Sequence, residues 1–182
     1  MRKLTATLCL TLAMLLGSVG VSASADYQKG VAAYKNGDHA TALRQWTPLA
    51  EQGNANAQYN LGLMYDDGQG VPQNYKIAVK WYTLAAKQGA AAAQSNLGFM
   101  YAHGKGVPKD YKTAVKWYTL AAKEGNAIAQ FNLGCMYDEG HGVRQDNKIA
   151  AKWYRLAAKQ GDASAQKNLK ILKKEMNLWW EF

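Results

Sequence analysis

The chain has 182 residues, of which 48% are hydrophobic, and its 22 Lys or Arg against 13 Asp or Glu give a formal net charge of +9. That length suits one ordinary domain or a short repeat array. The three histidines have no metal-ligand pair spacing and no phosphate-binding glycine loop is present, which argues against a metal-dependent or nucleotide-binding enzyme.

The first 25 residues have the order of a secretory signal peptide. Arg2 and Lys3 precede an apolar run from Leu4 to Leu16, and Ala23-Ser24-Ala25 supplies the small-x-small pattern of a cleavage site. We expect cleavage near Ala25 and a periplasmic or secreted protein with no stable membrane span. A retained anchor is disfavoured because the apolar run is short for a span of about 20 residues.

Cleavage would remove Cys9 and leave Cys135 as the single cysteine of the mature chain. No internal disulfide could then form even in an oxidising compartment, so stability must come from packing. Cys135 stands at an apolar repeat position, which favours a small buried hydrophobic side chain over a reactive thiol.

Three nearly identical segments recur at a period of 36 residues. The motif Ala-Gln-x-Asn-Leu-Gly-x-Met-Tyr starts at Ala57, Ala93 and Ala129, and a fourth copy at Ala165 has Lys170 in place of the glycine. Each full copy continues through Gly-x-Gly-Val and then Ala-x-Lys-Trp-Tyr-x-Leu-Ala-Ala-Lys. A fixed period of this size predicts stacked supersecondary units in place of one globular core.

Each unit is predicted to form two antiparallel helices. In the first helix, Leu61, Met64 and Tyr65 form an i, i+3, i+4 apolar stripe. Gly62 allows another helix to approach closely, and Gly68 is expected to end this helix in a left-handed conformation.

The second helix is expected to start after Asn74, which can cap its exposed amides, and to end at Gly89. Its packed face is predicted to consist of Ala78, Tyr82 and Ala85. Trp81 recurs at Trp117 and Trp153, and we interpret these side chains as covering the adjacent long loops rather than stacking on a ligand. In the last full copy, Arg144 replaces the loop proline, which predicts a looser loop.

The chain is therefore divided into a short unit over 26–56, repeats over 57–92, 93–128 and 129–164, and a closing segment over 165–182. The short unit has a tight turn at Asn36-Gly37-Asp38 in place of the long loop. The closing segment is predicted to hold a lysine-rich capping helix from about Asp162 to Asn177. Its aromatic tail, Leu178-Trp179-Trp180-Glu181-Phe182, either folds back over the end of the array or contacts a partner.

Together, the Leu-Gly-x-x-Tyr helix, the Gly-x-Gly-Val loop, the Ala-x-x-Trp-Tyr helix and the Ala-Ala-x-x-Gly ending resemble the Sel-one-like repeat family. The resemblance covers residues 57–169 closely, and residues 26–56 look like an ordinary tetratricopeptide unit. It implies an all-α fold, a right-handed α-solenoid of antiparallel helix pairs. It also implies a non-catalytic scaffold, since exported members of this type resemble scaffolds in envelope signalling, polysaccharide secretion and host contact.

The resemblance further implies that the first helices line a concave groove that binds a peptide segment or protein partner. Most candidate positions differ between copies, whereas the packing positions do not. The candidate partner-binding residues are Tyr59, Asn60, Leu63, Asp66, Asn96, Phe99, His103, Phe131, Asn132, Asp138 and Lys167. Further groove-facing positions are Asp67, Ser95, Ala102, Cys135, Glu139, Ile171 and Lys174. The asparagine of each copy either binds the main chain of the peptide or makes a repeated hydrogen bond between helices.

Two other functions remain open. Repeated lysines on the second helices predict a basic strip, which is either a solvated convex face or an attachment surface for an anionic partner such as an acidic polysaccharide. Nucleic acid is not expected, because lysine alone lacks base-reading chemistry. Ser164 and Lys167 match the Ser-x-x-Lys motif of β-lactam-reactive enzymes, but the Ser-Asp-Asn and Lys-Thr-Gly partners are missing. We therefore expect no catalytic residue and no cofactor.

Overall fold

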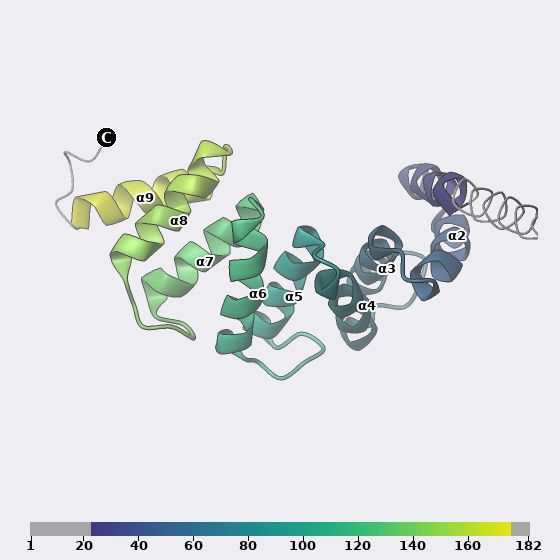
Figure 1. Cartoon of the computed structure of the whole chain (residues 1–182), viewed down its shortest axis with the longest axis horizontal. Helices are drawn as coiled ribbons and strands as arrows, with labels where there is room; N and C mark the ends of the chain where they lie inside the picture. Colours follow the sequence, from purple (N-terminus) through teal and green to yellow (C-terminus); the bar gives the residue numbers. More distant parts are fainter. Residues whose placement is uncertain (1–22, 176–182) are drawn as a thin grey trace, which may run out of the picture.

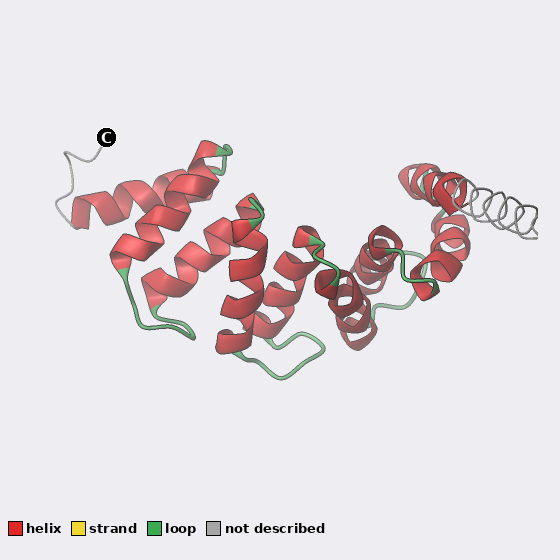
Figure 2. Cartoon of the chain, in the orientation of Figure 1, coloured by secondary structure: helices red, strands yellow, loops and turns green. Residues whose placement is uncertain are grey.

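The computed structural model describes residues 23–175, and its helices follow one another in a curved array (Figure 1). The first helix covers residues 23–35. The next eight are α2 (His39–Glu51), α3 (Ala55–Asp67), α4 (Tyr75–Lys87), α5 (Ala91–His103), α6 (Tyr111–Lys123), α7 (Ala127–Glu139), α8 (Asn147–Lys159) and α9 (Ala163–Glu175). Within these residues no strand occurs (Figure 2), and the expected all-α solenoid of helix pairs is confirmed.

Two predicted segments lie largely outside the described residues. They are the charged and apolar parts of the expected signal peptide, including Cys9, and the aromatic tail over 178–182. The expected cleavage motif, Ala23-Ser24-Ala25, lies at the start of the described part of the first helix. Across residues 23–175, no helix has the length and apolar character needed to cross a membrane.

Capping residues set the helix ends as the sequence predicts. Gly68 follows α3 with a φ of 72°, and the side chain of Asn74 accepts a hydrogen bond from the Ile77 amide at the start of α4. Asp110 and Asp146 cap α6 and α8 in the same way. The first helices α3, α5 and α7 begin two residues before the boundaries expected at 57, 93 and 129.

The hydrophobic core is divided among four clusters, each between the second helix of one unit and the first helix of the next. In the cluster between α4 and α5, Ala78, Tyr82 and Ala85 pack against Ala93 and Leu97, and all five are fully buried. The predicted packed face of the second helix is therefore confirmed. Because every cluster joins two units, the core that holds each repeat is made with its neighbour.

The tryptophans of the second helices serve this packing. Trp81 and the loop residue Val71 both pack against the cluster between α2 and α3. Trp117 and Val107 pack on the next cluster, and Trp153 packs on the one after that. Each tryptophan is half-buried, which agrees with the structural role expected for it.

A glycine in each first helix lies under a buried tyrosine ring. A methyl group at Gly62 would lie 2.4 Å from both Cδ1 and Cε1 of Tyr82, and Gly98 and Gly134 meet Tyr118 and Tyr154 in the same way. The close approach predicted at Gly62 is therefore made by the tyrosine of the second helix in the same unit.

The long loops connect each repeat to the one before it. Gly106, with a φ of 71°, lies so close to the backbone of Tyr75 that a methyl group there would be 2.4 Å from the Tyr75 carbonyl oxygen. Gly142 approaches Tyr111 in the same way, and the Asp146 amide donates to the Tyr137 carbonyl as in the earlier loops. The looser third loop expected from Arg144 is therefore not observed, because the same backbone contacts close it.

Buried glutamines add a second connection between units. Gln58, Gln94 and Gln130 donate to the carbonyls of Ala50, Ala86 and Ala122, in the last turns of the preceding second helices. Gln88 and Gln160, each 30 residues further on, donate to Gln58 and Gln130. Residue 124, which has the same place in the middle unit, is a glutamate, and Oε1 of Gln94 is buried without a hydrogen-bond partner.

Replacing Glu124 by glutamine is therefore expected to stabilise the array. The new amide would donate to the unpaired Gln94 oxygen, and an intramolecular hydrogen bond of this kind contributes about 0.5–1.5 kcal/mol. Thermal unfolding followed by circular dichroism measures the change. The reciprocal variant Gln88→Glu should lower the unfolding temperature, and equal unfolding temperatures for both variants and the wild type would refute this account.

Candidate functional site

The first helices α3, α5 and α7 form the inner face of the array. α5 and α7 are in contact across a repeat boundary, whereas no two second helices contact each other to the same degree. Both ends of the array rise toward the same side in Figure 1, so the stack of helices is curved. We use "inner face" for the surface of these three helices.

Most of the predicted site residues keep part of their surface on this face. Phe99, His103 and Lys167 are exposed, and the other eight candidates are half-buried. Two further positions expected to face the groove do not do so: Ser95 and Ala102 are buried in the packing between helices. Their small side chains fit between neighbouring helices, so they offer almost no surface to a partner.

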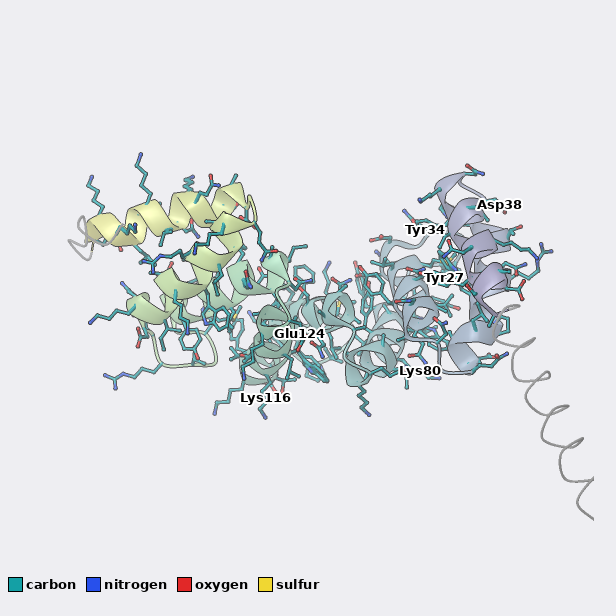
Figure 3. All side chains as sticks on the ribbon, turned by 45° about the horizontal axis from the view of Figure 1, so that its top comes forward. Tyr27, Tyr34, Asp38, Lys80, Lys116 and Glu124 are labelled. Atoms are coloured by element: carbon teal, nitrogen blue, oxygen red, sulfur yellow. The ribbon has the colours of Figure 1, made fainter. Side chains whose placement is uncertain are left out.

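A hollow lies at the N-terminal end of the inner face. It is partly open and has a volume of about 210 Å³. Its lining consists of Tyr27, Val31, Tyr34, Lys35, Trp46, Asn60 and Leu63. The Asn60 amide donates to the Tyr27 hydroxyl at 3.2 Å, and Figure 3 shows Tyr27 and Tyr34 at this end of the array. The predicted residues Asn60 and Leu63 therefore meet side chains of the short first unit.

In two repeats, the asparagine of one unit hydrogen-bonds the tyrosine of the unit before it. Asn96 donates to the Tyr82 hydroxyl, which lies 3.2 Å from the Asp66 carboxylate. Asn168 donates to the Tyr154 hydroxyl at 3.3 Å, and that hydroxyl lies 3.1 Å from Asp138. Burial raises the pKa of Asp66 above its ordinary value, although the hydrogen bond from Tyr82 opposes this.

The middle repeat lacks this chain of hydrogen bonds. Ala102 stands where the flanking units have Asp66 and Asp138, and neither Tyr118 nor Asn132 has a hydrogen-bond partner among the described residues. The Tyr118 side chain as a whole is only 1% exposed, although its hydroxyl is not one of the fully buried unpaired atoms. The bond between helices is therefore made by Asn96 and Asn168, whereas the Asn132 amide at the centre has no such bond.

Charge is segregated between the two helices of each repeat. α3, α5 and α7 hold no lysine or arginine, and their carboxylates are Asp66, Asp67, Asp138 and Glu139. α4, α6 and α8 hold three lysines each and no carboxylate. Lys105, in a loop, lies 5.1 Å from the Phe99 ring and reduces the negative potential at Asp66.

The repeat pattern matches a known family over most of the folded array. The model of the Sel1 repeat matches residues 55–89, 91–126 and 127–162. The chain belongs to the Sel1 repeat family. No curated protein is significantly similar to it in sequence.

Solved structures agree with this assignment. A Sel1 repeat protein from Oxalobacter formigenes is 38% identical with a TM-score of 0.78, and the match covers 82% of this chain and 62% of that one. A protective antigen of uropathogenic Escherichia coli strains displaying an SLR fold is also 38% identical, with a TM-score of 0.81 over 89% of this chain and 36% of that one. The chain thus spans less than two thirds of either protein.

The cysteine-rich protein B of Helicobacter pylori shares the fold at 22% identity. Its TM-score is 0.56, and the match covers 70% of this chain and 92% of that one. Sel1 repeats generally mediate protein–protein interaction and are typically non-catalytic scaffolds.

The sequence motif of β-lactam-reactive enzymes and the single described cysteine were the candidates for a catalytic group. Ser164 and Lys167 are both exposed on α9, and no hydrogen bond joins them. Burial raises the pKa of the Cys135 thiol, which disfavours the reactive thiolate. In residues 23–175, no group of His, Cys, Asp and Glu is placed to hold a metal ion.

Two features of the site were not predicted from the sequence: the hollow at the N-terminal end and the missing hydrogen bonds of the middle repeat. Tyr27, Val31 and Tyr34 recur at helical spacing and could have indicated an apolar face on the first helix. The sequence predicts Tyr118 only as a packing residue. Its hydroxyl lacks an acceptor because Ala102, sixteen residues earlier, takes the place of the aspartate found in the flanking units.

Proposed function

We propose that this chain is an exported scaffold whose inner face binds an extended peptide segment of a protein partner. The observation that carries the proposal is the unpaired Asn132 amide at the centre of that face, together with the unpaired Tyr118 hydroxyl of α6. The Asn132 side chain is half-buried and the Tyr118 side chain is 1% exposed, and a polar group left without a partner gains from a hydrogen bond supplied by a ligand. A peptide main chain offers both the donor and the acceptor that these two groups need.

The side chains of the proposed partner follow from the surroundings of this pair. Tyr59, Leu63, Phe99 and Phe131 supply apolar surface. α3, α5 and α7 hold four carboxylates and no lysine or arginine, although the loop residue Lys105 partly offsets Asp66. We infer that the bound segment carries apolar side chains together with lysine or arginine. The hollow at the N-terminal end is large enough to take one apolar side chain beside Lys35.

Export is part of the proposal and is supported by the sequence of the first 25 residues. Cleavage after Ala25 would make Asp26 the first residue, next to Tyr27 at the edge of the hollow. Amino-terminal sequencing of the protein recovered from the envelope fraction and the culture medium tests cleavage and location together.

The role of the middle repeat is tested with a peptide selected from a random 12-residue library on the purified chain. We expect Asn132→Ala to weaken binding of this peptide about five- to tenfold, because one hydrogen bond to the main chain is lost. Asn168→Ala is the matched control, since it removes a bond between helices and should lower thermal stability while leaving affinity within twofold. Unchanged affinity in Asn132→Ala would remove the support for a peptide site at this position.

A further inference from the structure

The second helices carry a repeated set of lysines on one face. These are Lys76, Lys80 and Lys87 in α4, Lys112, Lys116 and Lys123 in α6, and Lys148, Lys152 and Lys159 in α8. At 100° per residue, the i, i+4, i+11 spacing places each trio within about 40° of the helix circumference and over about 16 Å of its length. We call these nine residues the basic strip.

None of the nine charges is neutralised within the described part of the chain. All nine side chains are exposed, and none forms an ion pair. Lys80 and Lys152 contact only the faces of the neighbouring Trp81 and Trp153 rings, at 5.9 and 5.8 Å. α4, α6 and α8 contain no carboxylate of their own, so positive charge is in excess along the strip, although Lys116 attracts the carboxylate of Asp110 at the start of α6.

The repeat architecture joins the three trios into one surface. The core clusters recur at the same positions in successive units, so each second helix presents the same face to solvent. Figure 3 shows Lys80 and Lys116 along the same edge of the array, away from Tyr27 and Tyr34. With about 8–10 Å between packed helices, and two helices per repeat, the strip extends over roughly 40 Å.

We propose that the basic strip binds a linear acidic polysaccharide, while the inner face stays available for the protein partner. A polysaccharide with one carboxylate or sulfate on most of its sugars can place successive negative charges along the whole basic strip. Several weak contacts on one polymer act together, so a modest attraction at each lysine yields a stable complex.

A polymer fits this surface better than a lipid bilayer or a nucleic acid does. Membrane-surface helices place an apolar stripe toward the lipid, but here lysines occupy the centre of the exposed face and the tryptophans are half-buried against the core. The array is also curved, so a flat bilayer would meet only part of the strip (Figure 1). For nucleic acid, α4 and α6 lack arginine, and two of the tryptophan faces already hold lysine ammonium groups.

The test uses polygalacturonate as the acidic polymer and neutral dextran as its control. Binding to the purified chain is measured by calorimetry at low salt for the wild type and two triple variants. Lys80→Gln, Lys116→Gln, Lys152→Gln removes one charge from each second helix. Lys167→Gln, Lys170→Gln, Lys174→Gln removes the same charge from the exposed face of α9, outside the strip.

We expect the wild type to bind polygalacturonate and not dextran, with affinity falling as salt is added. The strip variant should bind at least fivefold more weakly, and the α9 variant should stay within twofold of the wild type. Equal losses in both variants would show a response to net charge and would overturn the proposal. So would binding to phosphatidylglycerol vesicles or to single-stranded DNA that is tighter than binding to the polysaccharide. Circular dichroism of each variant confirms that the helices are retained.

Discussion

The variant Gly62→Ala is expected to destabilise the protein by about 1–3 kcal/mol, although alanine is the better helix former. In an open helix, replacing glycine by alanine stabilises by about 1 kcal/mol. Here the added methyl would lie 2.4 Å from two atoms of the Tyr82 ring. The ring is fully buried and packed between α3 and α5, so it cannot move without disturbing the core. Urea unfolding measures the change.

Position 170 provides the control for this prediction. It is the equivalent of Gly62 in α9, where a lysine is exposed and no following helix is described that could place a ring over it. At this site, Lys170→Ala should be more stable than Lys170→Gly by about 1 kcal/mol, which is the ordinary helix preference. If alanine is favoured over glycine at both positions 62 and 170, the contact with Tyr82 does not restrict position 62.

The variant Gly106→Ala should cost about 2–4 kcal/mol and release the long loop from the preceding repeat. An L-residue other than glycine pays about 1–2 kcal/mol to adopt the left-handed φ of this residue. In addition, the methyl would be 2.4 Å from the backbone of Tyr75, which is held at the start of α4. Urea unfolding gives the total loss, and hydrogen exchange of the loop amides over 104–110 reports the local release.

The variant at Gly125 separates the cost of the left-handed backbone from the cost of the clash with the preceding repeat. Its φ is +85°, but a methyl group there would meet nothing within 4 Å. Gly125→Ala should therefore lose only the backbone part, about 1–2 kcal/mol, without faster exchange in the 104–110 loop. Equal losses at 106 and 125 would contradict a docking role for the long loop.

The fold could be predicted from the sequence because its determinants are local and repeated. Gly68 ends a helix because glycine readily adopts a left-handed conformation, and Asn74 starts one because its side chain caps the first amides. Residues with the same roles recur in three copies at one spacing, so the prediction did not depend on a single position. Contacts between units were harder to predict. Nothing within the Gly-x-Gly-Val motif indicates that Gly106 lies on the backbone of Tyr75, thirty-one residues earlier, because that contact depends on how the units stack.

The site was predicted less completely for a related reason. The asparagines are identical in every copy, so the sequence left two roles open for all of them. The difference between Asn96 and Asn132 comes from their neighbours across the unit boundary, where Ala102 takes the place of Asp66. Ser95 and Ala102 were expected on the surface because helical periodicity alone does not report how deeply the neighbouring helices enclose a small side chain.

Binding of the library-selected peptide to two double variants tests the inner-face assignment most directly. Phe99→Glu with Phe131→Glu places charge on the inner face, and Leu84→Glu with Leu120→Glu makes the same change on exposed residues of α4 and α6. Phe99 and Leu84 are matched, since both are 37% exposed, whereas Leu120 is 45% exposed and Phe131 is half-buried against a core cluster. We expect the phenylalanine pair to weaken peptide binding at least 30-fold, or about 2 kcal/mol, and the leucine pair to weaken it less than twofold. Equal affinities for the two pairs, or a larger loss for the leucine pair, would place the binding surface elsewhere on the array.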